Sequence, residues 1–231
     1  MEYVVGIIMN SLEILYEDNH IIVVVKPYNV LSQGDNTNDL DMVSLIKDYL
    51  KEKYQKSGNV YLGLVHRLDR PVGGIMVFAK TSKAASRLSR QISNHEFKKT
   101  YLAVVNGTSL KNNDEFCDYI VKGNDNSSYI ADDSVGKFSK LNYKVLEINK
   151  DNNLSLVGIN LITGRHHQIR VQFASRGYPL YGDQRYGKMD KKQIALFAYK
   201  LEFIHPVKKE LMTFVKYPKK IGVWSLFNSI K

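Results

Sequence analysis

The chain has 231 residues, 44% hydrophobic and 24% charged, a composition that excludes a disordered tail and a collagen-like fibre. Its 33 Lys and Arg residues exceed its 23 Asp and Glu residues, and the formal charge of +10 favours a polyanionic partner. The single cysteine, Cys117, excludes an intramolecular disulfide and a cysteine-built metal site, and it fits a reducing, cytoplasmic setting.

Membrane insertion and secretion are not indicated. The apolar run Ile21 to Val25 is far shorter than the roughly 20 residues that a membrane span requires. Residues 1–10 lack a basic leader followed by a small-residue cleavage site, so we expect a soluble, unprocessed chain. The positive charge is spread along the chain rather than along one amphipathic helix, which favours a nucleic acid over a lipid surface.

The first half of the chain predicts a hairpin, two helices and a further pair of strands. Runs rich in β-branched residues indicate the strands, and apolar residues spaced by three or four indicate the helices. The expected elements are a hairpin over 13–26, a helix over 42–56, strands over 61–68 and 75–79, and a helix with Ser82 as its N-cap.

The second half predicts more strands than helices. The expected strands cover 99–105, 139–148, 154–162, 194–204 and 210–217, and the expected helices cover 167–176 and 223–229. Because most strands follow one another through short turns, we expect an α+β fold with a mixed, largely antiparallel central sheet flanked by helices and loops. Without an internal repeat or a clear linker, residues 1–231 are expected to form a single domain.

Charged residues interrupt an apolar context at 64–70. On a strand, His66 and Leu68 would face one way, and Arg67 and Asp69 the other. An Asp at a strand end, between two arginines and before Pro-Val-Gly-Gly, would stay ionised on a turn that a substrate can approach, which suits a nucleophile. The alternative, commoner for such an Asp, is that Asp69 caps a turn and pairs with an arginine at the surface.

A second polar cluster, at 163–170, reads Thr-Gly-Arg-His-His-Gln-Ile-Arg. If a helix begins after Gly164, Arg165 lies near its positive end, which the helix dipole disfavours, so Arg165 is expected to have a carboxylate or phosphate partner. The alternative is a solvated basic end of a surface helix. The paired histidines do not have the spacing of a metal site, so no zinc is expected.

Tyr101 lies in an expected strand near basic residues, where its ring could stack on a base. The alternative is ordinary packing, which is the commoner role of a tyrosine in a chain that has 15 of them. The helix after Ser82 has Lys83, Arg87 and Arg90 along one side. These three residues are candidates for phosphate contacts, although such a stripe is most often a solvated face.

Several segments together resemble one family. Residues 66–80, which read His-Arg-Leu-Asp-Arg-Pro-Val-Gly-Gly-Ile-Met-Val-Phe-Ala-Lys, resemble the signature segment of the RluA-type pseudouridine synthases. Residues 163–170 and 177–187 resemble the later GRxHQIR and GxPxxGDxxYG motifs of that family in order and spacing. The opening hairpin and the closing strand of the family resemble residues 15–27 and 196–206.

The resemblance implies an enzyme that detaches a uracil from its ribose, rotates it and reattaches it through carbon 5, without a metal or organic cofactor. It implies that Asp69 is the essential aspartate, that Arg165 pairs with Asp69, and that Tyr101 stacks on the target base. The base must first be flipped out of the RNA, and Arg67 would fill the gap that it leaves. Whether Asp69 attacks the nucleotide or assists cleavage otherwise stays open.

The implied partner is structured RNA, either ribosomal or transfer RNA, with no membrane and no obligate protein partner. RNA contacts are expected from His66, Arg67, Arg70, Lys83, Arg87, Arg90, His167 and Arg170. The whole chain, 1–231, is then one catalytic domain without a separate N-terminal RNA-binding module, and a monomer is the default expectation.

Two alternatives and two departures from the family pattern stay open. The chain could be a catalytically silent RNA-binding protein, against which the intact Asp69, Tyr101 and Arg165 argue. It could also be a nucleoside hydrolase, against which the lack of a metal-binding Asp cluster argues. Val72 and Gly73 replace a common Thr-Ser pair, and His166 stands where Thr is frequent.

Overall fold

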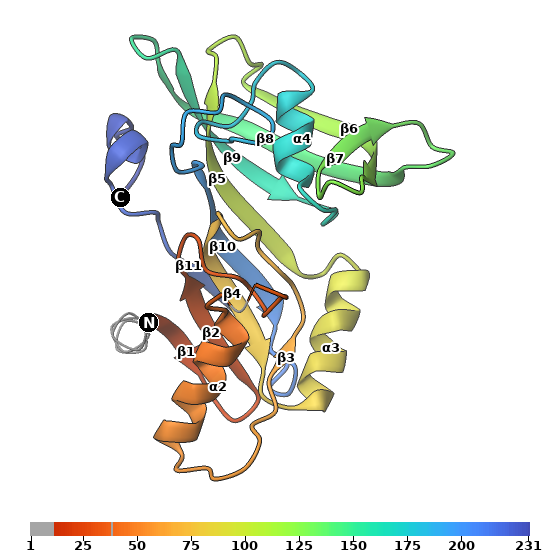
Figure 1. The fold of residues 1–231 in the computed structure, drawn as a ribbon, viewed down its shortest axis with the longest axis vertical. Helices are drawn as coiled ribbons and strands as arrows, with labels where there is room; N and C mark the ends of the chain where they lie inside the picture. Colours follow the sequence, from red (N-terminus) through yellow and green to blue (C-terminus); the bar gives the residue numbers. More distant parts are fainter. Residues whose placement is uncertain (1–11, 38) are drawn as a thin grey trace. The chain divides into compact units, whose positions relative to one another are not determined.

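A computed structural model describes residues 12–37 and 39–231 (Figure 1). The prediction that residues 1–10 carry no signal peptide lies outside the described residues. The chain divides into two compact units: unit 1 holds the residues up to 97 together with 201–216, and unit 2 holds 98–200 together with 217–231. A single catalytic domain over the whole chain therefore stays a prediction.

Unit 1 is built around two buried antiparallel strands, β2 (Ile21–Lys26) and β4 (Gly73–Ala79). Its other strands are β1 (Ile14–Glu17), β3 (Gly63–Leu64), β11 (Leu211–Val215) and the end of β10 (Leu196–Ile204). Strand β2 pairs with β1 on one side and with β4 on the other, and β3 also pairs with β4. Every residue of β4 is buried, as expected for a continuous apolar run that is covered on both faces.

Two capped helices complete unit 1. Helix α2 (Met42–Lys53) begins after Asp41, whose carboxylate accepts hydrogen bonds from two backbone amides of the first turn. Helix α3 (Ser82–Ser93) packs on β3 and β4 (Figure 1). Its N-cap is Thr81, so the prediction of Ser82 was one residue late, and the Thr81 hydroxyl accepts from the amide of Ala84. The apolar face of α3 enters a core in which the rings of Phe97 and Phe203 stack at 5.4 Å.

The predicted strand over 61–68 is wrong except at Gly63–Leu64. Side chains, rather than a partner strand, take the backbone hydrogen bonds of this region. His66 Nε2 accepts from the amide of Val77 at 3.1 Å. The hydroxyl of Ser32 donates to the carbonyl of Leu68 at 2.7 Å and accepts from its amide at 3.1 Å. The segment that leads to Asp69 is therefore an anchored, irregular stretch.

The strands of unit 2 lie in the order β10-β5-β9-β8-β6-β7, and the neighbouring pairs from β5 to β7 are antiparallel. Its further strands are β5 (Lys98–Asn106), β6 (Asn113–Lys122), β7 (Ser128–Ala131), β8 (Lys137–Asn149) and β9 (Leu154–Leu161). The sequence predicted β5, β8 and β9 but not β6 or β7. Strand β6 includes Asp114, Glu115 and Asp118, and such residues are depleted in strands, so its pattern carried little strand signal.

Helix α4 (Gln168–Ala174) packs on β6 and β7 (Figure 1). The ring of Phe173 lies 5.0 Å from that of Phe116 and 5.3 Å from that of Tyr143, which fixes the helix on the sheet. The helix expected over 223–229 is a 3-10 helix at Gly222–Leu226, a common form for helical pieces this short.

The predicted fold class is confirmed. All strand pairs whose register is described are antiparallel, and residues 12–37 and 39–231 contain three α-helices besides them. The protein therefore has an α+β fold with a largely antiparallel sheet. Within the part of the chain that the structure describes, no helix has the length and apolar character needed to cross a membrane.

Candidate active site

Asp69 lies in unit 1 on the turn between β3 and β4. The amide of Val72 donates to the carbonyl of Asp69 at 2.9 Å and closes the turn. Val72 is buried and the side chain of Asp69 is half-buried. Gly74, with φ of 130°, leads into β4 through a conformation that residues with a Cβ rarely adopt. The turn thus presents a carboxylate on a firmly held backbone.

A fully buried lysine lies beneath this turn. Lys26 Nζ donates to the carbonyl oxygens of Pro27 at 3.0 Å, Val30 at 2.5 Å and Arg70 at 3.0 Å. Burial lowers the pKa of Lys26 to about 7, an effect that the negative charge of Asp69 opposes and the charge of Arg70 reinforces. Lys26 therefore ties the end of β2 to the turn that carries the candidate nucleophile.

The residues that flank Asp69 differ in how they are engaged. His66 accepts a backbone hydrogen bond through Nε2 and packs its ring 5.3 Å from that of Phe97. Arg70 forms an exposed ion pair with Asp39 at 2.7 Å. Arg67 is exposed. Arg67 and Arg70 thus lie at the surface, as an RNA contact requires, whereas the described contacts of His66 hold the fold.

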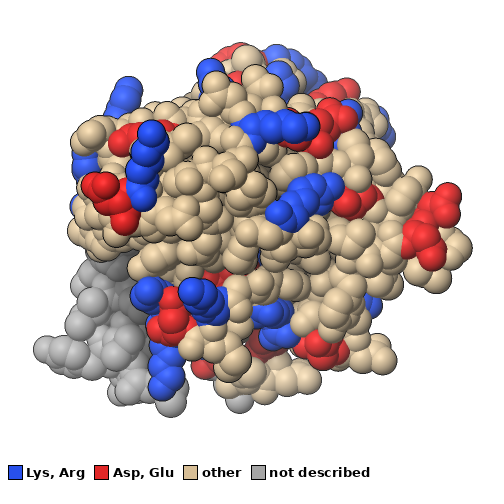
Figure 2. Space-filling model, turned by 90° about the horizontal axis from the view of Figure 1, so that it is seen from above, with Lys and Arg blue, Asp and Glu red and all other residues tan. Residues whose placement is uncertain are grey.

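The basic stripe on α3 is only partly at the surface. Lys83 and Arg90 are exposed, whereas Arg87 is half-buried and donates to the carbonyl of Pro206 at 2.7 Å. On the face drawn in Figure 2, Lys and Arg side chains are scattered among Asp and Glu side chains rather than gathered in one patch. RNA contact by this stripe stays a prediction.

Tyr101 and Arg165 lie in unit 2. Tyr101 is on β5, opposite Ile159 of β9, and is only 6% exposed. Arg165 is exposed on the loop between β9 and α4, where its Nε donates to the carbonyl of Phe138 at 3.0 Å. Helix α4 begins only at Gln168, so Arg165 precedes the helix instead of lying in its first turn. Asp69 belongs to the other unit, and its pairing with Arg165 stays a prediction.

Gln168 holds the loop that carries Arg165. Its Oε1 accepts from the hydroxyl of Thr163 at 2.8 Å and from the amide of Arg165 at 3.0 Å. Its Nε2 donates to the carbonyl of Lys140 at 3.1 Å. Gln168 is buried, so these hydrogen bonds lie away from competing water. The backbone of Arg165 is therefore fixed even though its side chain is exposed.

Ser128 of β7 contacts His166, and Tyr186 contacts His167. Ser128 Oγ donates to the carbonyl of His166 at 2.8 Å and lies 2.9 Å from His166 Nδ1. The amide of Ser128 donates to Tyr186 Oη at 2.7 Å, and Tyr186 Oη lies 2.9 Å from Nδ1 of His167. Burial raises the pKa of Tyr186, so its hydroxyl keeps its proton. His166, at the position where Thr is frequent in the family, thus makes contacts of its own.

Arg170 is 6% exposed and forms a bidentate pair with Asp183, both bonds being 2.8 Å. Its guanidinium also lies 5.2 Å from the ring centre of Tyr186. His167 and Arg170 therefore join the loop to residues 183–186, and these contacts are structural. Their predicted contacts with RNA are not supported by this geometry and stay predictions.

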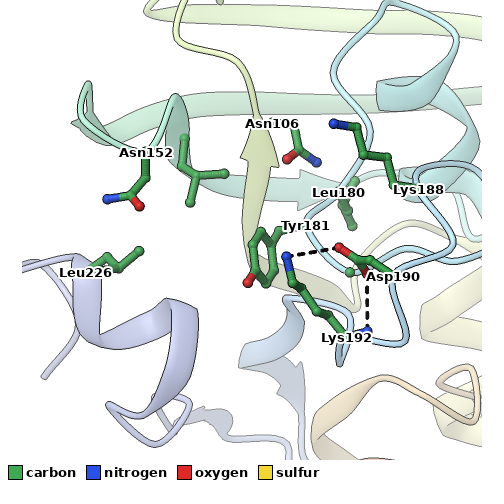
Figure 3. A pocket seen from close by; sticks show the side chains of 10 residues that line it. Asn106, Asn152, Leu180, Tyr181, Lys188, Asp190, Lys192 and Leu226 are labelled. Atoms are coloured by element: carbon green, nitrogen blue, oxygen red, sulfur yellow. Dashed lines mark hydrogen bonds and ion pairs between the residues drawn. The ribbon is translucent and has the colours of Figure 1, made fainter.

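A pocket of about 300 Å³ lies elsewhere in unit 2 (Figure 3). In it, Lys192 Nζ lies 3.1 Å from Asp190 and 5.0 Å from the ring centre of Tyr181. The pocket is lined by Asn106, Asn152, Leu154, Leu180, Tyr181, Gly182, Lys188, Asp190, Lys192 and Leu226. None of the predicted site residues is among them. Across residues 12–37 and 39–231, no group of three or more His, Cys, Asp or Glu side chains is placed to hold a metal ion.

Comparison with known proteins decides the family. Residues 20–175 match the family model described as RNA pseudouridylate synthase. The chain belongs to this family. A dual-specificity RNA pseudouridine synthase, RluA, from Haemophilus ducreyi is 34% identical over 220 residues, which cover 90% of this chain and 93% of that protein. An uncharacterized RNA pseudouridine synthase, YhcT, from Bacillus subtilis is 33% identical over 205 residues, which cover 87% of this chain and 67% of that protein.

Solved structures show the same pseudouridine synthase fold. Human RNA Pseudouridylate Synthase Domain Containing 4 superposes with a TM-score of 0.79 at 20% identity, over 98% of this chain and 96% of that one. Human RNA Pseudouridylate Synthase Domain Containing 1 superposes with a TM-score of 0.72 at 21% identity, over 94% of this chain and 87% of that one. The predicted RluA-type family is confirmed, and the protein is a pseudouridine synthase, an isomerase that acts on RNA.

Sequence reasoning missed three residues that support the pseudouridine synthase site. Lys26 was visible only as a charged residue at the end of an apolar strand, before a proline. Gln168 lay inside a recognised motif without an assigned role. Ser128 gave no signal, because its partner His166 is 38 residues away in the sequence.

Proposed function

We propose that this pseudouridine synthase isomerises specific uridines in ribosomal or transfer RNA by a cofactor-free mechanism that depends on Asp69. The observation that carries this proposal is the Asp69 turn, a half-buried carboxylate on a backbone held by Ser32 and Lys26. Relatives support the RNA class: those in Zymomonas mobilis and Rickettsia bellii are named ribosomal large subunit pseudouridine synthases, and the Haemophilus ducreyi relative is named dual-specificity.

The reaction begins with extrusion of the target uridine, which costs a few kcal/mol of stacking. Phosphate contacts by exposed cations offset this cost, and the net charge of +10 provides a surplus of them. Arg67 is exposed beside the Asp69 turn and is assigned to the gap that the flipped base leaves. Lys83, Arg70 and Arg90 are exposed as well and are assigned to the RNA backbone.

Chemistry at the flipped nucleotide is assigned to three residues. Asp69 acts on the nucleotide as the glycosidic bond breaks, either as a nucleophile or by assisting the cleavage. Arg165, whose side chain is exposed, is assigned to pair with the Asp69 carboxylate. Tyr101 stacks on the base and assists proton transfer at carbon 5. The enzyme acts as a monomer in the cytoplasm, a setting that suits its one cysteine.

The direct test is nucleoside analysis by mass spectrometry after incubation of the purified enzyme with transfer RNA and ribosomal RNA transcripts. We expect pseudouridine from the wild type and none from Asp69→Asn, which should still bind RNA. The matched control is Asp39→Asn, which removes an exposed carboxylate paired with neighbouring Arg70 and should leave turnover within about 2-fold.

Two outcomes would contradict the proposal. The wild type could bind both RNAs without forming pseudouridine, while pseudouridine maps of cells with and without the gene show no lost site. That result would favour a silent RNA-binding protein. Alternatively, Asp69→Asn could retain full turnover, in which case the reaction does not depend on Asp69.

A further inference from the structure

Lys99 lies at the start of β5, close to two of the residues assigned to chemistry. In the ladder with β9, Lys99 is opposite Leu161 and Tyr101 is opposite Ile159. Because side chains alternate along a strand, Lys99 and Tyr101 project from the same face of β5. Their Cα atoms are two residues apart along the strand, roughly 7 Å.

The Lys99 ammonium also lies against the loop that carries Arg165. A Cβ atom built on Gly164 would be 3.2 Å from Lys99 Nζ, which is closer than most side-chain contacts. Gly164 is exposed and Lys99 is half-buried, so the ammonium lies near the surface of the loop, where an incoming molecule can meet it. Lys99, Tyr101 and Gly164-Arg165 are thus brought together within unit 2.

Nothing in the described part of the protein accounts for a cation at this position. Within residues 12–37 and 39–231 the Lys99 ammonium has no hydrogen bond or ion pair, and burial alone lowers its pKa. Lys26, by contrast, donates to three carbonyl oxygens. A desolvated cation without a partner costs stability, so a ligand that supplies the missing acceptor explains why it is tolerated.

We propose that Lys99 binds an anionic oxygen of the target nucleotide, between Tyr101 and the Gly164-Arg165 loop, and is a further substrate-binding residue of this enzyme. The inference rests on the proposed function, in which the substrate is a uridine in RNA. Two oxygens have the required chemistry. One is the phosphate of the flipped nucleotide. The other is a uracil carbonyl, which takes up negative charge when the electron pair of the glycosidic bond leaves with the base.

The test compares Lys99→Met and Lys99→Arg with the control Lys98→Met. Lys98 is the exposed neighbour of Lys99 and projects from the opposite face of β5. We expect Lys99→Met to lower kcat/KM by roughly 10- to 100-fold, as loss of a charge-assisted hydrogen bond does. Lys99→Arg should retain more activity, and Lys98→Met should stay within about 2-fold of the wild type.

Stability separates this role from a structural one. Because Lys99→Met removes a desolvated charge and keeps most of the apolar stem of the side chain, the variant should unfold at the same temperature as the wild type or at a higher one. A residue that merely holds the loop would lose stability together with activity. A drop in both quantities, or unchanged kcat/KM in Lys99→Met, overturns the proposal.

Binding and turnover distinguish the two oxygens. A phosphate contact predicts a weaker Kd for RNA and a salt slope reduced by roughly 0.7 to 0.9. A uracil contact predicts a lower kcat with unchanged Kd. If the wild type forms no pseudouridine at all, the proposed function fails. In that event only a weaker Kd in Lys99→Met supports a role for Lys99, and an unchanged Kd overturns it.

Discussion

Replacing Asp183 by Asn is expected to destabilise the protein by about 3–5 kcal/mol, because it leaves the buried guanidinium of Arg170 without a counter-charge. The side chains of the pair are 7% and 0% exposed, and both hydrogen bonds between them are 2.8 Å long. Asp183 Oδ1 also accepts from the amides of Arg185 at 3.0 Å and Tyr186 at 3.2 Å. Asn keeps an oxygen for these two amides, but its amide nitrogen cannot accept from Arg170 Nε, so the substitution removes the charge and one hydrogen bond of the pair.

The measurement is equilibrium unfolding in urea of the wild type, Asp183→Asn, Arg170→Met and the double variant. Because the double variant removes both charges, it should recover at least half of the loss caused by Asp183→Asn. The matched control is Asp39→Ala, which breaks a pair whose side chains are 48% and 42% exposed and should cost less than about 1 kcal/mol. If the single losses simply add in the double variant, the buried pair is not coupled and the reasoning is refuted.

Three further predictions concern pH and turnover. Burial would raise the pKa of Glu17, but hydrogen bonds from partners that include Lys53 and Lys80 outweigh it and lower that pKa to about 2. The contribution of Glu17 to the unfolding free energy should therefore be lost as pH falls from 4.5 toward 2. In a series of urea-unfolding measurements at falling pH, Glu17→Gln should lose less stability than the wild type. Folding lowers the pKa of Lys26 from 10.5 to about 7, so between these pH values the unfolded state binds more protons and the contribution of Lys26 to stability rises with pH. The difference in unfolding free energy between the wild type and Lys26→Met should therefore change between about pH 7 and 10, and a constant difference would contradict this. Arg165→Met should lower turnover much more than the unfolding free energy, because the side chain is exposed, and equal proportional losses would argue against its pairing role.

The fold was predictable where one kind of signal dominated. The apolar run of β2 and the polar turn before it predicted the first hairpin, and the periodic apolar residues of α2 and α3 predicted those helices. Strand β6 was missed because it holds three acidic residues, a type that is depleted in strands. The prediction of a strand over 61–68 was wrong outside Gly63–Leu64. Side-chain atoms of His66 and Ser32 take backbone hydrogen bonds that a partner strand would otherwise take, and no local sequence pattern predicts this.

The candidate site was predictable only as a set of motif residues. Asp69, Tyr101 and Arg165 stood out because they matched a family pattern, which identifies a residue type at a position but not its contacts. Ser128 depends on partners 38 and 58 residues away in the sequence, so its role follows from the folded chain alone. Lys99 had the same limitation, since only the fold places its ammonium against Gly164.

Hydrogen-bond partners divide the residues of this enzyme into those that build the site and those that face the substrate. Gln168 and Arg170 of the 163–170 segment use their polar atoms within unit 2, which leaves the Arg165 side chain and the surface at Gly164 exposed. The same criterion separates two lysines: Lys26 donates to three carbonyls, and Lys99 has no acceptor in the described chain. Lys26→Met leaves three carbonyl oxygens without their donor, so this variant should lose more stability than Lys99→Met. Lys99→Met removes a cation that the proposal assigns to the substrate, so it should lose activity without losing stability.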